Sequence, residues 1–180
     1  MTTAQTSGTD NTGTTSADES CRMTVSRRIG ADAGTIFAIL ADPSKHTEID
    51  GSEMLRGALT DTVVSGVGDV FVLKMYLERL GGDYQMANEV VEYEQDRRIT
   101  WEPRRHDADS PIPGHLWGYE LTPDGENATV VTEIFDCSRW AEEDKPFIDY
   151  GRTWIEPMTK TLERLDELAT PRSTDGPLAG

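Results

Sequence analysis

The longest regular hydrophobic pattern in the chain lies near its end, at 144–170. Apolar residues and one glycine recur there at steps of three or four, which keeps them on one face of a helix. They are Phe147, Gly151, Trp154, Met158, Leu162 and Leu165. Such a face has to be buried, so the pattern predicts one long amphipathic helix packed on a sheet. Pro157 predicts a kink within it, because proline lacks a backbone donor and crowds the preceding turn.

Most of the chain before this helix alternates between apolar and polar residues, as strands do. We expect a first strand at Arg22–Ile29, then a short helix capped by Asp32 and ended by Pro43, and a further helical turn near 44–48. Six more strands are expected, at 53–60, 69–79, 83–94, 97–103, 114–122 and 128–138. Turn signals such as 81–82 and 123–125 separate neighbouring strands, which favours antiparallel pairing.

Both ends of the chain have the composition of disordered polypeptide. The first 20 residues are rich in Thr and Ser and contain no basic residue, and the last ten are rich in Pro, Gly, Ser and Thr. Neither segment can bury enough apolar surface to offset the entropy lost on ordering. We therefore expect one folded domain at 22–169, between disordered tails at 1–21 and 170–180.

Charge and hydrophobicity narrow the classes of partner. The sequence holds 17 basic and 33 acidic residues, a net charge of −16. Such a surface repels phosphate backbones and anionic lipid head groups, so we expect no nucleic-acid partner and no charge-driven membrane binding. No apolar run approaches the roughly 20 residues needed to cross a bilayer, so we expect no membrane insertion.

The start of the chain and its cysteines suggest a compartment. The first residues lack the basic and then apolar segments of a secretory signal. The two cysteines, Cys21 and Cys137, are far apart in sequence, one beside the expected tail and one in an expected strand. This pattern excludes a disulfide framework and favours a reducing compartment. We therefore expect a cytoplasmic protein.

The order of strand, two helices, six strands and long helix, together with several local strings, resembles the START-like superfamily. This superfamily, also called SRPBCC or Bet v 1-like, includes polyketide cyclase/dehydrase and lipid-transport relatives. The strings that carry the resemblance lie at 31–43, 97–101, 117–121, 131–136 and 161–165. The resemblance implies an α+β helix-grip fold, in which a curved seven-stranded antiparallel sheet wraps around the C-terminal helix. It also implies a cavity between sheet and helix for a hydrophobic small molecule, but it does not imply one chemistry.

The wall of such a cavity should combine inward-facing strand residues with the first half of the last helix. The candidates for ligand binding are Met75, Met86, Trp101, Trp117, Tyr119, Phe135, Tyr150, Arg152, Trp154 and Met158. Each has the alternative of being ordinary core, because a slip of one residue in strand register turns a whole set outward. Arg152 has the alternative of a surface ion pair.

Two residues are candidates for acid/base chemistry. If Thr129, Val131 and Phe135 face the cavity, alternation puts Glu133 there too, where burial would raise its pKa; the alternatives are a salt bridge with Arg152 or a solvent-facing position. His115 is in phase with Trp117 and could relay a proton, or it is structural. The three histidines lack metal-ligand spacing, no serine stands in a nucleophile elbow, and no glycine pair precedes a helix, so we expect no metal and no cofactor.

Three hypotheses follow for function. The first is a monomeric or homodimeric protein that binds an aromatic, polyketide-like or lipidic molecule. The second is an enzyme on the same scaffold, a cyclase/aromatase or dehydratase that acts on a polyketide-like ketone through Glu133 or His115. The third is an interaction module like the activator of a chaperone, which shares this fold and would need an exposed apolar patch rather than a deep pocket.

Overall fold

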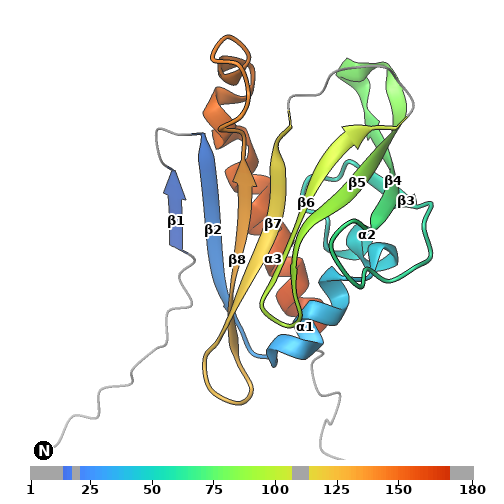
Figure 1. Ribbon diagram of the computed structural model, residues 1–180. Coiled ribbons are helices and arrows are strands. Elements are labelled where there is room, and N and C mark those ends of the chain that lie inside the picture. Colours follow the sequence, from blue (N-terminus) through green and yellow to red (C-terminus); the bar gives the residue numbers. More distant parts are fainter. Residues whose placement is uncertain (1–13, 18–20, 107–113, 171–180) are drawn as a thin grey trace, which may run out of the picture.

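The computed structural model describes residues 14–17, 21–106 and 114–170. Its antiparallel sheet curves around a C-terminal helix that crosses one face (Figure 1). The strands are β1 (Thr14–Ala17), β2 (Arg22–Ile29), β3 (Leu55–Ala58), β4 (Val70–Leu77), β5 (Gly82–Glu94), β6 (Arg98–Arg105), β7 (Leu116–Pro123) and β8 (Thr129–Asp136). The α-helices are α1 (Ala33–Leu40), α2 (His46–Ile49) and α3 (Ile155–Ala169), and the 3₁₀ segments are η1 (Pro43–Lys45), η2 (Glu78–Leu80) and η3 (Lys145–Trp154).

The strand order explains how the two ends of the domain meet. The sheet runs β1-β2-β8-β7-β6-β5-β4-β3. After β2 the chain crosses through α1 and α2 to the far edge at β3, and then returns strand by strand to β8, which pairs with β2. Strands β2 to β8, the two short helices and the C-terminal helix confirm the predicted α+β helix-grip fold with seven strands.

Strand β1 adds an eighth strand at the β2 edge, which the sequence did not predict. It lies inside 1–21, the segment expected to be a disordered tail, and it pairs antiparallel with β2. The backbone groups of almost any residue can form the hydrogen bonds of a strand pair, so amino-acid composition does not predict this strand. Residues 1–13, 18–20 and 171–180 lie outside the described residues, so the two tails and the domain limits of 22–169 stay predictions.

Helix α1 forms where the sequence predicted it, because its first turn has a strong cap. The Asp32 carboxylate accepts a hydrogen bond from the Thr35 backbone N–H at 2.9 Å. The helix buries Ile36, Phe37 and Leu40 on one face and ends before Pro43. No helix in the described part of the chain is long and apolar enough to span a membrane.

The last helical segment is less regular than its hydrophobic pattern predicts. The α-helix begins only at Ile155, and within η3 the backbone of Asp149, Tyr150 and Gly151 has positive φ. A Cβ at Gly151 would lie within 3.4 Å of side-chain atoms of β2 and β8, so the chain reverses there against the sheet. The kink predicted at Pro157 is therefore wrong: the break lies at 148–151, and the proline sits in the first turn of α3, where no backbone donor is needed.

The burial predicted for the whole helical stripe also fails at its start. Phe147 is 71% exposed, and its ring lies under the Arg79 guanidinium at 4.9 Å from the ring centroid. The left-handed residues that follow it rotate this part of η3 away from the face that α3 presents to the sheet. Met158, Leu162 and Leu165 are fully buried as expected.

The two cysteines form a disulfide, contrary to the sequence prediction. Cys21 precedes β2 and Cys137 follows β8, and because Arg22 is paired with Asp136, the two Cα atoms lie 5.2 Å apart. A separation of 116 residues hid this proximity, since it arises from the pairing of the first and last strands of the predicted sheet. The cysteines therefore give no support to a reducing compartment, and a cytoplasmic location stays a prediction.

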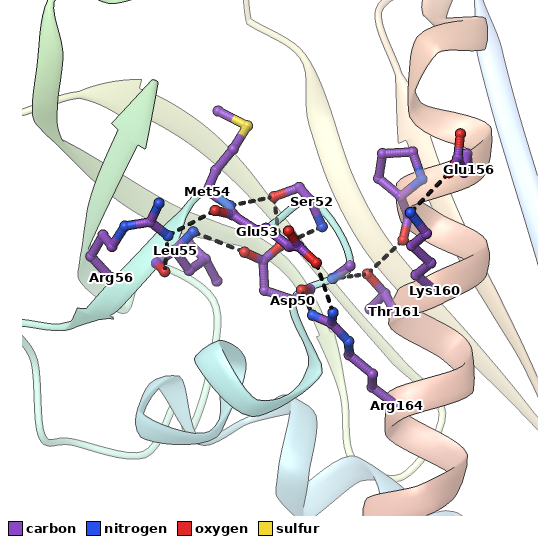
Figure 2. Close-up of polar contacts among 12 residues, drawn as sticks. Asp50, Ser52, Glu53, Met54, Leu55, Arg56, Glu156, Lys160, Thr161 and Arg164 are labelled. Carbon is purple, nitrogen blue, oxygen red and sulfur yellow. Dashed lines mark hydrogen bonds and ion pairs between the residues drawn. The ribbon is translucent and has the colours of Figure 1, made fainter. Parts of the chain in front are cut away.

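Helix α3 is fastened to the loop between α2 and β3 (Figure 2). The Gly51 backbone N–H donates to Thr161 Oγ1 at 3.1 Å, and Arg164 donates to the Asp50 carbonyl and to the Glu53 carboxylate. The Asp50 carboxylate holds the loop in shape by accepting from the backbone N–H of Ser52 at 2.9 Å and from that of Leu55 at 2.8 Å. This contact sets the distance between the helix and the far edge of the sheet.

Replacing Gly51 with alanine should destabilise the protein strongly. A Cβ there would meet the Pro157 carbonyl and would lie 2.6 Å from the Thr161 backbone nitrogen, so the loop and the helix would have to separate. We expect a loss of about 3 kcal/mol or more in the free energy of unfolding, measured by urea denaturation. Gly66→Ala is the control, because nothing lies within 4 Å of a Cβ at Gly66. Equal stability of the two variants would contradict this account of the helix contact.

Candidate functional site

A cavity of about 250 Å³ lies between the concave face of the sheet and the start of α3. Strands β4 to β8 supply about half of the residues that line it, and α2, the loop after it and the first turns of α3 close it from the other side. The wall is mainly aromatic and aliphatic. Of the twelve candidate site residues, the structure places these in the wall: Met75, Met86, Trp101, His115, Trp117, Tyr119, Glu133 and Trp154.

The other four candidates lie away from the cavity wall. Phe135 packs behind it, with ring centroids 5.1 Å from Trp117 and 5.6 Å from Trp154. Met158 is fully buried in the core. Tyr150 and Arg152 belong to η3, where the left-handed backbone turns the chain away from the helical face that periodicity predicted.

Arg152 is exposed, and its guanidinium group lies 3.6 Å from the Asp149 carboxylate. It therefore forms a surface ion pair, which was the alternative to ligand binding for this residue.

Several wall residues were not among the candidates. Leu73, Tyr84 and Asn88 lie two residues from Met75 or Met86 on the same strands, so the alternation that identified the methionines also applied to them. His46 and Thr161 come from α2 and α3. No motif marks these two residues, because the packing of the helices against the sheet brings them to the cavity.

Glu133 is the most deeply buried acidic residue in the wall, with 1% of its surface exposed. Its neighbours on β7 hold one of its two oxygens: the Trp117 indole N–H donates to Oε1 at 2.8 Å, and the Tyr119 hydroxyl donates to the same atom at 3.0 Å. Tyr119 stands directly opposite Glu133 in the β7–β8 register, which explains this pairing. The Oε2 atom has no hydrogen-bond partner among the described residues.

Burial controls the charge of this carboxyl group. Desolvation raises the pKa of Glu133 from 4.5 to about 8, with a smaller contribution from the negative charge of Asp50, and the hydrogen bonds from Trp117 and Tyr119 only partly oppose it. Burial also raises the pKa of Tyr119 well above its ordinary value. At neutral pH the cavity therefore contains a protonated carboxyl group rather than a carboxylate. It is neither solvent-facing nor the partner of Arg152, which pairs with Asp149.

His46 adds a second buried polar ring to the wall. It stacks on Trp101 with a centroid distance of 5.5 Å and an interplanar angle of 22°, and it meets Phe71 edge to face. Its Nε2 lies 2.8 Å from the Leu40 carbonyl oxygen, which can only accept, so Nε2 carries the proton. Burial lowers the pKa of His46, and the ring is therefore neutral at pH 7.

His115 lies just before β7 and packs on Phe135 and Trp140, with ring centroids 5.4 Å and 5.9 Å away. It shares the cavity with Glu133 but belongs to this aromatic cluster. Within the part of the chain that the structure describes, no three His, Cys, Asp or Glu side chains are grouped closely enough to hold a metal ion. The chemistry that this site offers is thus a mainly apolar, aromatic cavity with a neutral carboxyl group at Glu133, a neutral imidazole at His46 and a second imidazole at His115.

Known proteins give a family for this arrangement. A family model described as polyketide cyclase / dehydrase and lipid transport matches residues 20–170. An uncharacterized protein of Mycobacterium tuberculosis H37Rv is 33% identical over 115 residues, which cover 64% of this chain and 47% of that protein. The chain therefore spans about half the length of the curated relatives that it matches.

Solved structures show the same fold. Protein Ms6760 from Mycobacterium smegmatis aligns with a TM-score of 0.67 and 19% identity, over 90% of this chain and 99% of that one. A protein from Arthrobacter aurescens aligns with a TM-score of 0.67 and 18% identity, over 89% and 92% of the two chains. At these identities the likeness establishes the fold and leaves the ligand open.

The raised pKa of Glu133 predicts a specific pH dependence of stability. Between pH 4.5 and about 8 the folded protein keeps a proton that the unfolded chain has lost, so stability falls as the pH rises through this window. At about 1.4 kcal/mol per pKa unit, the loss is on the order of 5 kcal/mol by pH 9. Glu133→Gln removes this titration and keeps the other ionisable groups. We expect the stability of the variant, relative to the native protein, to rise from pH 5 to pH 9 in urea denaturation; parallel pH curves would show that Glu133 is not buried in this way.

Proposed function

Because the chain belongs to the polyketide cyclase/dehydrase and lipid transport family, we propose that it binds a hydrophobic small molecule in the cavity between the sheet and α3. The observation that carries this proposal is the composition of the cavity wall. Rings of Trp101, Trp117 and Trp154 and the thioethers of Met75 and Met86 meet there, in an enclosure of about 250 Å³. Apolar walls with a few placed polar groups are typical of ligand sites, and methionine adapts to ligands of irregular shape.

The size of the cavity favours a compact ligand. Pockets for drug-sized molecules usually measure about 300–1,000 Å³, and this cavity lies just below that range. We therefore favour an aromatic or polyketide-like molecule of a few rings over a lipid with two long chains. The aromatic rings of the wall support the same preference, because edge-to-face contacts with them stabilise a bound aromatic ring.

A second candidate function is catalysis on the bound molecule. The protonated carboxyl group of Glu133 is the observation that favours it, because a group with a pKa of about 8 can give and take a proton near neutral pH. The reaction would be a cyclisation or dehydration of a bound ketone, with the cavity holding the substrate in a folded shape. His115 is the alternative proton carrier in the same cavity.

Blocking the cavity should abolish binding of a hydrophobic fluorescent probe. Met75 and Tyr76 are neighbours on β4, but Met75 lines the cavity and Tyr76 is exposed on the other face. Met75→Trp should therefore weaken binding of N-phenyl-1-naphthylamine by at least about tenfold, a cost of about 1.4 kcal/mol, while Tyr76→Trp keeps native affinity. The measurement is a fluorescence titration. Equal affinity of the two variants would place the binding site elsewhere.

The variant Glu133→Gln distinguishes a catalytic role of this residue from a role in ligand binding alone. The amide keeps the shape of the side chain but cannot exchange a proton at neutral pH. If Glu133 acts as general acid or base, turnover of a carbonyl compound co-purified with the protein should fall by about 100-fold or more, with its affinity retained. Product formation is followed by mass spectrometry, and unchanged turnover would exclude Glu133 from the chemistry.

A further inference from the structure

The cavity wall contains buried polar atoms that have no hydrogen-bond partner among the residues that the structure describes. Glu133 Oε2 and the indole Nε1 of Trp154 are among them. Folded proteins pair most of their buried polar atoms, because an unpaired one forfeits its hydrogen bonds to water. Two such atoms around one cavity suggest that a ligand completes them.

The hydrogen bonds of Glu133 determine where its proton lies. Oε1 already accepts from two groups, the indole N–H of Trp117 and the hydroxyl of Tyr119. An indole N–H can only donate, so Oε1 acts as an acceptor and the proton of the neutral carboxyl group belongs to Oε2. Glu133 therefore presents an O–H donor.

The second unpaired atom is also a donor, and its ring packs on a residue that contacts Glu133. Trp154 packs edge to face on Trp117 with ring centroids 5.3 Å apart, and Trp117 is the residue that holds Glu133. The cavity wall thus has two donors without acceptors, Glu133 Oε2–H and Trp154 Nε1–H. Two neutral donors in a mainly apolar wall favour an oxygen that brings lone pairs and no charge.

We propose that the ligand carries a neutral oxygen acceptor, a ketone or ester carbonyl, and that Glu133 Oε2–H donates to this oxygen. This inference rests on the proposed function and specifies the polar group of its ligand. A carbonyl oxygen accepts hydrogen bonds and brings neither a charge nor a donor of its own. An ammonium group offers only donors and would leave Trp154 Nε1 unpaired.

The other titratable groups around the cavity do not replace this carboxyl group. Asp50 uses its carboxylate on the backbone of its own loop, and Tyr119 donates to Glu133. His46 is held by the Leu40 carbonyl, and His115 packs in the aromatic cluster near Phe135. Arg79 stacks on Phe147, so its guanidinium group is drawn toward η3.

Three matched ligands test the proposal by competition with N-phenyl-1-naphthylamine. They are 1-tetralone, tetralin and 1-aminotetralin, which share one bicyclic frame and differ in the polar group. At pH 6.5 we expect the ketone to bind about five- to tenfold more tightly than the hydrocarbon, the gain of about one hydrogen bond. Raising the pH to 9.5 should remove this preference, because the carboxylate formed above about pH 8 has no proton to donate.

Glu133→Gln is the matched variant, because its amide can accept at one end and donate at the other. It should keep a preference for the ketone at both pH values, and Glu133→Leu should lose it. If Glu133→Leu does not fold, the pH series on the native protein and on Glu133→Gln still decides the question.

The outcomes separate this inference from the proposed function. Equal binding of 1-tetralone and tetralin at pH 6.5 would overturn the carbonyl contact and leave the cavity as a binding site. Tighter binding of 1-aminotetralin, lost in Glu133→Gln, would overturn it in favour of a cationic ligand. Failure of the fluorescent probe itself to bind would overturn the proposed function, and this inference with it.

Discussion

The position of α3 over the sheet determines whether this protein has a cavity at all. Along its second half the helix packs into the core through Leu162 and Leu165. At its first half it is held by the loop after α2, where Gly51 allows the backbone of the loop to reach Thr161. The core thus holds the second half of the helix, and the loop after α2 holds its first half. The space between the first turns of α3 and strands β4 to β8 remains open to a ligand.

The loop that fastens the helix is itself part of the cavity wall. Asp50 shapes this loop with its carboxylate, and the same negative charge contributes to the raised pKa of Glu133 across the cavity. Burial nevertheless has the larger effect on Glu133, and the donors Trp117 and Tyr119 are too few to offset it. The fold therefore keeps a carboxyl group neutral in an apolar site, which suits it to donate a hydrogen bond.

Local patterns in the sequence predicted the fold well, because they report local physics. The alternation of 22–29 gave β2 with its observed bounds, and Asp32 gave the start of α1. Alternation also allowed the cavity side of β8 for Glu133, as one of the alternatives, and the structure has it there. These features depend on the period of a strand or on one capping side chain, so neighbouring residues are enough to predict them.

Features that depend on long-range contact were not predictable in the same way. The disulfide requires the pairing of β2 with β8, and the left-handed turn at Tyr150 depends on the close approach of Gly151 to that pair of strands. Because of this turn, Tyr150 and Arg152 do not line the cavity, as they were predicted to do from a regular helix. His46 likewise lines the cavity because α2 packs against the sheet, and no sequence motif predicts this packing.

The central claim is that the cavity under α3 holds a hydrophobic molecule. Native mass spectrometry of the freshly purified protein, followed by extraction and identification of any bound compound, tests it most directly. We predict a complex with a small, ring-containing molecule, whose added mass disappears in Met75→Trp and persists in Tyr76→Trp. A native protein that carries no such molecule and also fails to bind N-phenyl-1-naphthylamine would contradict the claim.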